Sequence, residues 1–440
     1  MDVKTLCVTV GATEDTTLSV VRRYMEYFDL EKVVFLVTDK TRQYAKGEEG
    51  LKSEIITVSP SSYAENLKLK LDCDAIDITG GTKHMASAFS IIAAQNKKGI
   101  SYLEGPGYFR SAYPEVPRWL QKFESYNLDF KFRRSYVKEL PGSLPSINKF
   151  SSKHEFLSAF SRVVNFFDEG ELSLQFVREG VNESEFTIHS DDKGNFEEAK
   201  KMYNLLRDLM RGYSSEELEA LVGLKSVKFK GAEVNPKHLA LLPDTNFFYY
   251  VDAYRLLLDY EPIIYVSECV KDELINKANP DLNRVQHPKL EDRMVACLAY
   301  HQYLSLASNS MSLPIKAEEG YCDKEIVKEY EENLYVRMYL VTNDKDVIAR
   351  VNNLRQIKPF NPPLSLESEP KYERSLGTYA LFKMIGTIIY FSRGEIKAVI
   401  GGKRNGKWVE VEIRLSDNIH ERNLKCDTFY NKMFKVDMLR

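Results

Sequence analysis

The sequence predicts an α/β protein with several domains, and three observations support this prediction. The chain has 440 residues, which is too long for a single hydrophobic core. Short apolar runs alternate with amphipathic stretches over residues 1–125, as in a parallel sheet covered by helices. A second series of apolar runs, each followed by acidic residues, lies within residues 236–355.

These observations divide the chain into four regions. The predicted regions are a Rossmann-like parallel sheet at 1–125, a helical or winged-helix connector at 126–235, a second α/β domain at 236–355, and a C-terminal α+β extension at 356–440. In the last region, the dipeptide Asn405-Gly406 between alternating apolar residues predicts a tight β-hairpin. In the connector, helices are predicted over 154–167, 196–210 and 214–221.

The composition limits the possible partners and compartments. The chain is 43% hydrophobic and 28% charged with a net charge of −3, so a nucleic-acid site would have to be a local basic patch. The six cysteines form no CxxC pairs, which argues against structural zinc and against a disulfide scaffold. Met1 leads directly into a strand pattern, and no apolar run approaches the ~20 residues of a membrane helix. We therefore expect a cytoplasmic protein without a membrane partner.

Strands and helices alternate in the first region. The predicted strands are 6–10, 32–37, 53–58, 75–78 and 101–103, and the predicted helices include 16–28 and 82–95. Parallel sheets of this kind bind ligands beyond the carboxyl ends of their strands.

The segment Thr79-Gly-Gly-Thr-Lys83 lies at such a strand end and has the composition of a phosphate-binding loop. Two glycines let the backbone approach a ligand, the threonines add hydroxyls, and the lysine and the following helix N-terminus favour an anion. The segment matches neither the Walker pattern nor GxGxxG. A Gly-Gly turn that serves only tight strand-to-helix packing is the alternative interpretation.

Two more loops are predicted at the same edge of the sheet. Gly11, Thr13 and Thr16 follow the first strand, and Thr38 and Asp39 follow the second. Taken alone, each loop is more typical of ordinary helix capping than of a ligand site.

The string Asp77-Ile-Thr-Gly-Gly-Thr-Lys-His-Met85 on a doubly wound domain resembles the CRISPR-associated Rossmann-fold (CARF) sensors of type III immunity. The resemblance covers roughly residues 1–125. It implies a homodimer that binds a cyclic oligoadenylate, usually cyclic tetra-adenylate, across its two-fold axis. Degradation of the activator by the same domain (a ring nuclease activity) is an open alternative, because no signature in the sequence decides it. The residues expected in the ligand pocket are Gly11, Thr13, Thr16, Thr38, Asp39, Thr79, Gly80, Gly81, Thr82, Lys83, His84 and Met85.

The second α/β region carries an ordered series of acids at predicted strand ends and helix starts. They are Asp244 within Asp-Thr-Asn, Glu273, Asp323, Asp344 within Thr-Asn-Asp, and Asp346. Carboxylates brought together by a parallel sheet suit Mg²⁺ or Mn²⁺, which can activate a water for attack on a phosphodiester. Taken singly, each acid is more typical of a helix cap or a solvated surface residue.

The order of these motifs resembles a PIN (PilT N-terminus) nuclease domain over roughly 236–355. The resemblance implies metal-dependent cleavage of single-stranded RNA, with Asp244, Glu273, Asp323 and Asp344 as catalytic metal ligands and Asp346 as a further ligand. Asp292 competes with Asp323 for the third position. Asp323 is preferred because it precedes Asp344 by roughly one helix and one strand.

Together the two resemblances predict an endoribonuclease that a cyclic oligoadenylate activates. One alternative is a ligand-responsive DNA-binding regulator with a winged-helix connector. Another is an activator-dependent nuclease that cleaves DNA, because the sequence contains no motif that would select the 2′-hydroxyl of RNA.

Overall fold

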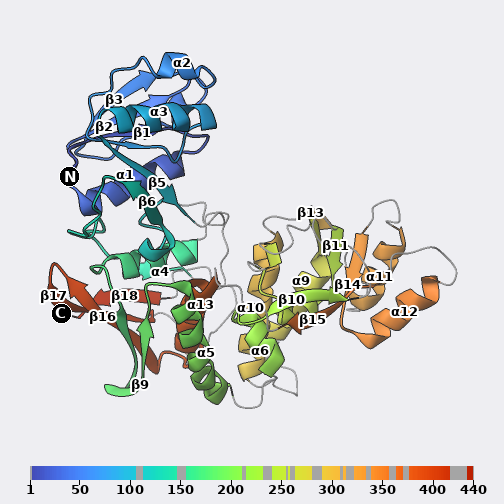
Figure 1. Ribbon diagram of the computed structural model, residues 1–440. Helices are drawn as coiled ribbons and strands as arrows, with labels where there is room; N and C mark the ends of the chain where they lie inside the picture. Colours follow the sequence, from blue (N-terminus) through green and yellow to red (C-terminus); the bar gives the residue numbers. More distant parts are fainter. Residues whose placement is uncertain are drawn as a thin grey trace.

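The protein has a mixed α/β fold built around three larger sheets (Figure 1). The computed structural model describes residues 2–105, 112–145, 155–210, 215–230, 240–253, 256–257, 263–279, 290–307, 311–313, 322–332, 338–355, 363–369, 376–416 and 434–439. Within these ranges, no helix is long and apolar enough to cross a membrane.

The first sheet is six-stranded and mostly parallel, as the sequence predicts. Its strands are β1 (Thr5–Thr9), β2 (Lys32–Val37), β3 (Lys52–Thr57), β4 (Ala75–Asp77), β5 (Gly99–Glu104) and β6 (Lys122–Tyr126), in the spatial order β3-β2-β1-β4-β5-β6. Only β6 is antiparallel to its neighbour, and the sequence analysis did not predict this strand.

Helices cover both faces of the first sheet because its central strands β1, β2 and β4 are buried on both sides. The helical segments of this region are α1 (Glu14–Tyr27), η1 (Arg42–Tyr44), α2 (Tyr63–Asn66), α3 (Lys83–Gln95) and η2 (Arg118–Leu120). The side chains of α1 share one core cluster with β1 and β2. Those of α3 share a second cluster with the opposite faces of these strands.

The second sheet joins two regions that lie far apart in the sequence. Its strands are β7 (Ser143–Leu144), β8 (Leu172–Arg178), β9 (Val181–Ile188), β16 (Ile396–Arg404), β17 (Lys407–Leu415) and β18 (Phe434–Met438), all antiparallel, in the order β7-β18-β17-β16-β8-β9. Segments from 126–235 and from 356–440 therefore share one sheet, and the connector contains two long strands as well as helices. Asn405 and Gly406 have positive φ values of 51° and 74° and form the expected tight turn between β16 and β17.

One buried helix anchors this second sheet. The helices of the region are α4 (Glu155–Asn165), α5 (Asp192–Leu209), α6 (Ser215–Leu221) and α13 (Gly377–Phe391). Every residue of α13 is buried, which explains its almost continuous apolar sequence. At Gly377 an added Cβ would lie 1.8 Å from the Asp192 carbonyl oxygen, so only glycine permits this contact between α13 and α5.

The third sheet is parallel and has the order β13-β12-β11-β14. Its strands are β11 (Ala240–Pro243), β12 (Ile263–Ser267), β13 (Met311–Leu313) and β14 (Met338–Val341). Its helices are α7 (Phe247–Tyr250), α9 (Glu268–Ala278), α10 (Leu290–Ala307), α11 (Cys322–Glu332) and α12 (Lys345–Arg355). Next to this sheet, β10 (Ser226–Lys230) pairs with β15 (Ser365–Glu369). Because β11 lies between β12 and β14, the ends of these three strands form one edge.

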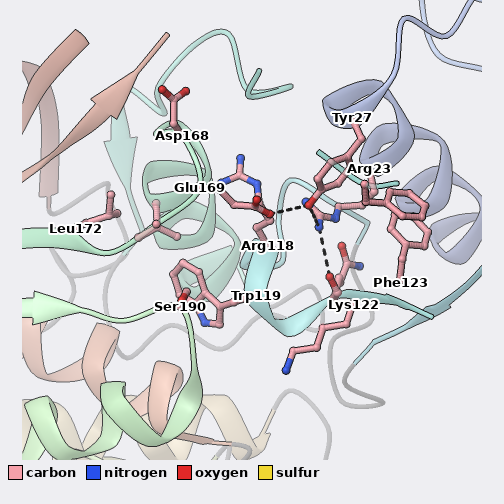
Figure 2. A pocket seen from close by; sticks show the side chains of 14 residues that line it. Arg23, Tyr27, Arg118, Trp119, Lys122, Phe123, Asp168, Glu169, Leu172 and Ser190 are labelled. Atoms are coloured by element: carbon pink, nitrogen blue, oxygen red, sulfur yellow. Dashed lines mark hydrogen bonds between the residues drawn. The ribbon is translucent and has the colours of Figure 1, made fainter. Parts of the chain in front are cut away.

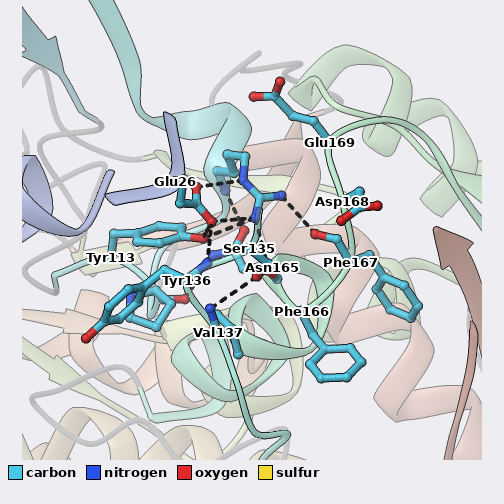
Figure 3. A network of polar contacts seen from close by, with 12 residues as sticks. Glu26, Tyr113, Ser135, Tyr136, Val137, Asn165, Phe166, Phe167, Asp168 and Glu169 are labelled. Carbon is cyan, nitrogen blue, oxygen red and sulfur yellow. Dashed lines mark hydrogen bonds and ion pairs between the residues drawn. The ribbon is translucent and has the colours of Figure 1, made fainter. Parts of the chain in front are cut away.

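A buried polar network joins the first sheet to α4 (Figure 3). Glu26 on α1 accepts hydrogen bonds from both sides of the Arg118 guanidinium, at 2.8 and 2.9 Å, and Arg118 also donates to the Asn165 carbonyl. Burial would raise the pKa of Glu26, but Arg118 and Arg23 lower it more, so the net shift is downward. Removing one partner of such a buried pair typically costs about 3–5 kcal/mol, so the two regions are firmly joined here.

Candidate functional site

The acidic residues lie at the carboxyl edge of the third sheet. Asp244 directly follows β11, and its backbone N–H continues the ladder by donating to the Val341 carbonyl of β14 at 3.1 Å. Because β11 and β14 are parallel and adjacent, Asp244 and Asp344 emerge on the same side.

Thr342 ties these two acids together. Its buried hydroxyl donates to Asp244 Oδ2 and accepts the backbone N–H of Asp344 at 2.9 Å. Asp244 Oδ1 accepts the N–H of Phe247 at 3.0 Å. Thr342 thus orients the Asp244 carboxylate and also holds the backbone of its own loop at Asp344.

Glu273 reaches the same edge from α9. Thr245, next to Asp244, donates its hydroxyl to Glu273 Oε2 at 2.8 Å. The other carboxylate oxygen of Glu273 pairs with Lys277 at 2.7 Å. Both threonines of the two short motifs therefore hold a neighbouring carboxylate, a role that the sequence analysis did not assign to Thr245 and Thr342 individually.

The electrostatics link Asp323 to this group. Asp244 is only 2% exposed, and burial raises its pKa to about 7, with further upward contributions from the charges of Asp323 and Asp344. Burial, followed by the charges of Glu273 and Asp344, raises the pKa of Asp323. Carboxylates perturb one another in this way when they lie close together in a partly dry site, and a cation would relieve their repulsion.

Asp346 and Asp292, the two remaining candidate metal ligands, are both exposed and lie outside the hydrogen-bonded pairs formed by Asp244 and Glu273. Asp346 is exposed on the first turn of α12, and its backbone N–H donates to Asp344 Oδ1 at 2.7 Å. Asp292 is exposed near the start of α10, where the next residue, Arg293, donates to the Ala278 carbonyl at the end of α9. The groups that raise the pKa of Asp244 or Asp323 include no contribution from Asp292.

The donor set fits a hard divalent cation by its chemistry, because all of its members are carboxylates. As placed, however, no group of three or more His, Cys, Asp or Glu side chains within the described residues is close enough together to ligate one ion. Glu273 is held by Thr245 and Lys277, so at least this side chain would have to turn to join a shared ion.

A disulfide bridge lies beside these acids. Cys269 on α9 and Cys322 at the start of α11 are bonded, with their Cα atoms 5.4 Å apart. The scattered cysteines predict no disulfide framework, so this bridge corrects that expectation; 53 residues separate its two cysteines, and no local spacing announces it. It connects the helix of Glu273 to the helix of Asp323.

The glycine-rich loop at the carboxyl edge of the first sheet is shaped by backbone contacts. A Cβ added to Gly80 would lie 2.3 Å from the Thr9 carbonyl oxygen, and one added to Gly11 would lie 2.6 Å from the Gly80 carbonyl oxygen. The loops after β1 and β4 therefore touch through their main chains, and neither position accepts a side chain without a shift.

The buried Asp77 side chain holds this loop in place through hydrogen bonds, a role not predicted from the sequence. It is fully buried, accepts the Thr79 N–H at 3.0 Å, and accepts the Ser101 hydroxyl at 2.6 Å. Burial raises the pKa of Asp77 to about 6. The Thr79 hydroxyl in turn accepts the Leu103 N–H at 2.7 Å, so the loop is linked to β5.

The candidate ligand-binding residues separate into two groups. In the first group, the side chains already have partners within the protein. The Thr82 hydroxyl accepts the Met85 N–H at the start of α3 and donates to the Pro60 carbonyl. Thr38 is buried against Thr41, and the Met85 side chain is only 1% exposed in the core. Lys83, His84 and Asp39 are exposed, and the exposed hydroxyls of Thr13 and Thr16 are 3.0 Å apart. The exposed group faces solvent and is available to a ligand, whereas the side chains of Met85 and Thr38 are not.

Comparison with protein-family models and with curated proteins gave no match for this chain. The CARF-like and PIN-like interpretations therefore remain proposals that depend on the motifs and on the geometry described above.

Proposed function

We propose that the protein is a metal-dependent endonuclease of the PIN type that cleaves single-stranded RNA and is activated by a cyclic oligoadenylate. The observation that carries this proposal is the grouping of Asp244, Glu273, Asp323 and Asp344 around one edge of a parallel sheet. Two of these carboxylates are oriented by threonine hydroxyls, and two have raised pKa values.

The proposed chemistry follows from the carboxylates. They would hold one or two Mg²⁺ or Mn²⁺ ions, which supply an activated water and polarise the scissile phosphate. Lys277 and Arg350 lie close enough to lower the pKa of Asp323 by their charges. Once bound metal ions neutralise the carboxylates, these two cations would be free to contact a phosphate backbone, although the chain as a whole has a net negative charge.

Activation is proposed to begin at the loops of the first sheet. Lys83 and the N-terminus of α3 would contact phosphates of the cyclic ligand, and a second copy of the chain would complete the site. The Glu26–Arg118–Asn165 network would transmit a change at α1 to α4. CARF-type sensing, the PIN-type reaction and the homodimer are parts of one proposal.

One experiment tests the proposal directly. Labelled single-stranded RNA and DNA are incubated with the purified protein, with and without cyclic tetra-adenylate and with and without Mn²⁺. We expect RNA cleavage only when both are present, leaving 5′-phosphate and 3′-hydroxyl ends. If only DNA is cleaved, the substrate is DNA and not RNA. If neither nucleic acid is cleaved in the presence of cyclic tetra-adenylate and Mn²⁺, the proposed function is refuted.

A further inference from the structure

Two pairs of adjacent residues connect the first sheet to the third sheet through the start of α13. On η2, Arg118 binds Glu26 of α1, and the next residue, Trp119, donates its indole Nε1 to the Thr378 hydroxyl of α13 at 3.0 Å. Both η2 residues line the cavity shown in Figure 2. On α13, Tyr379 directly follows Thr378. The contact with α13 therefore comes from the residue next to the buried Glu26–Arg118 pair.

The Thr378 hydroxyl holds η2 and α5 together at the start of α13. It accepts from Trp119 and, at 3.1 Å, from the Asn195 side chain, and it donates to Asp192 of α5 at 2.5 Å. A hydroxyl has one donor and two acceptor positions, and all three are occupied here. Because Thr378 is buried, a displaced Trp119 would leave a polar group without its partner in the core. We therefore expect the start of α13 to follow a movement of η2.

The next residue of α13 reaches the region of the acids. The Tyr379 hydroxyl donates to Asp252 Oδ2 at 2.9 Å, and the Lys383 ammonium, one helical turn further along, binds the same oxygen. All three side chains are buried. A buried ion pair adds little net stability over apolar side chains of equal size, and its best-attested role is to fix one arrangement of the parts that it joins. The pair thus fixes how α13 meets the segment after α7.

Asp252 is linked to the acidic edge by a short segment. It lies eight residues after Asp244, and α7 lies between them. At the start of α7 the Phe247 N–H donates to Asp244 Oδ1 at 3.0 Å, and beyond its end the Ala253 N–H donates to Gln302 of α10 at 2.8 Å. A displacement of Asp252 would therefore act on the Asp244 carboxylate through few intervening bonds.

We propose that Trp119, Thr378, Tyr379 and Asp252, here called the α13 connection, regulate cleavage at the acidic edge in response to the first sheet. Every residue of α13 is buried, and densely packed elements transmit strain, so a change at Thr378 reaches Tyr379. Trp119 and Tyr379 are positioning residues that act through Asp252. The inference rests on the proposed function for what is regulated, whereas the physical connection is testable without RNA or activator.

Hydrogen exchange tests the α13 connection in the full-length, activator-free protein. Trp119→Phe keeps an aromatic ring but removes the N–H that binds Thr378. We expect exchange to become faster, by roughly fivefold or more, at the amides of Ala253 and Leu256 on either side of the segment after Asp252. Tyr379→Phe, which removes a single hydroxyl, should have the same effect.

Thr387→Val is the matched control for this measurement. It also removes a buried hydrogen bond of α13, but that bond goes from the Thr387 hydroxyl to the Lys383 carbonyl within the helix itself. Exchange at Ala253 and Leu256 should stay within about twofold of the parent. If neither Trp119→Phe nor Tyr379→Phe speeds exchange there, or if Thr387→Val speeds it equally, the α13 connection is overturned.

Cleavage assays test whether the connection regulates the acids. With saturating cyclic tetra-adenylate, Trp119→Phe and Tyr379→Phe should each lower the stimulated cleavage rate by roughly fivefold or more, with activator affinity unchanged and Thr387→Val like the parent. Because the two contacts lie on one path, the double variant should lose no more than the more affected single variant. Parental stimulation of both single variants, or effects that multiply in the double variant, would overturn the regulatory role. If the parent is not stimulated at all, the proposed function fails and the regulatory role with it, while the exchange result still decides whether the connection exists.

Discussion

The two parallel sheets place their candidate sites at the same position, beyond the carboxyl ends of central strands, yet they build them in different ways. At the first sheet the surface is made by main chain, because Gly11 and Gly80 touch without side chains. At the third sheet it is made by side chains, because carboxylates are oriented by the hydroxyls of Thr245 and Thr342. In the proposed function, the first site would offer N–H groups and the exposed lysine to an anion, and the second would offer its acids to a cation.

This difference determines which substitutions should damage each site. A site made of main chain is insensitive to many side-chain changes but tolerates no added Cβ at its contact points. A site made of carboxylates depends on each charge.

Asp244→Asn is expected to abolish cleavage while leaving binding of cyclic tetra-adenylate near that of the parent. The substitution removes a buried charge at the third sheet and leaves the first sheet unchanged. Cleavage of labelled RNA and equilibrium binding of the activator provide the two measurements. Asp272→Asn, on the exposed side of α9, is the matched control and should remain active. Residual cleavage by Asp244→Asn above about a tenth of the parent, with normal metal dependence, would count against this site.

Asp323→Asn is expected to lower the cleavage rate at least about tenfold, whereas Asp292→Asn should leave it almost unchanged. Asp323 interacts electrostatically with the other acids, whereas Asp292 is exposed near the start of α10 and is not among the charges that shift the pKa of Asp323. Rates measured over a series of Mn²⁺ concentrations would show a higher metal requirement for Asp323→Asn alone. The opposite order would assign the third ligand to α10 and leave the other acids in place.

Part of this acidic site is predictable from the sequence alone, and part is not. The strand of β11 and the helix of α9 follow from local apolar patterns, and the motif order places Asp244 and Asp344 at strand ends before any coordinates are known. The partnership of Thr342 with Asp244 is different, since the residues are 98 positions apart and become neighbours only through the pairing of β11 with β14.

The same limit applies to the second sheet and to the disulfide. The hairpin at Asn405-Gly406 was predictable from its turn residues, but its pairing with β8 joins segments more than 200 residues apart and has no local signal. The strands β8 and β9 were missed because they lie next to strongly helical patterns. Cys269 and Cys322 show no characteristic spacing, and their contact depends on the packing of α11 against α9.

Lys83→Ala is expected to raise the activator concentration for half-maximal cleavage at least about tenfold, with maximal and basal rates unchanged. Lys83 is exposed at the first turn of α3, where its ammonium would add a charge-assisted contact worth ~1.5–3 kcal/mol in each subunit. Lys70→Ala is the control, because Lys70 is an exposed lysine outside the loops that follow β1, β2 and β4. If the half-activating concentration of Lys83→Ala equals that of the parent, Lys83 does not contact the activator.

The smallest expected effect concerns stability at the loop of the first sheet. Because burial raises the pKa of Asp77 to about 6, the folded protein keeps a proton that the unfolded chain loses near pH 4. The stability that this proton provides is fully present below about pH 4 and is lost as the pH rises through about 6. Asp77→Asn does not ionise, and its amide can still accept the Thr79 N–H and donate to Ser101. Urea unfolding of both proteins should therefore show the variant gaining about 2–3 kcal/mol relative to the parent between pH 4 and pH 8. If the stability difference between the two proteins does not change with pH, Asp77 does not have the raised pKa that its burial beneath the loop implies.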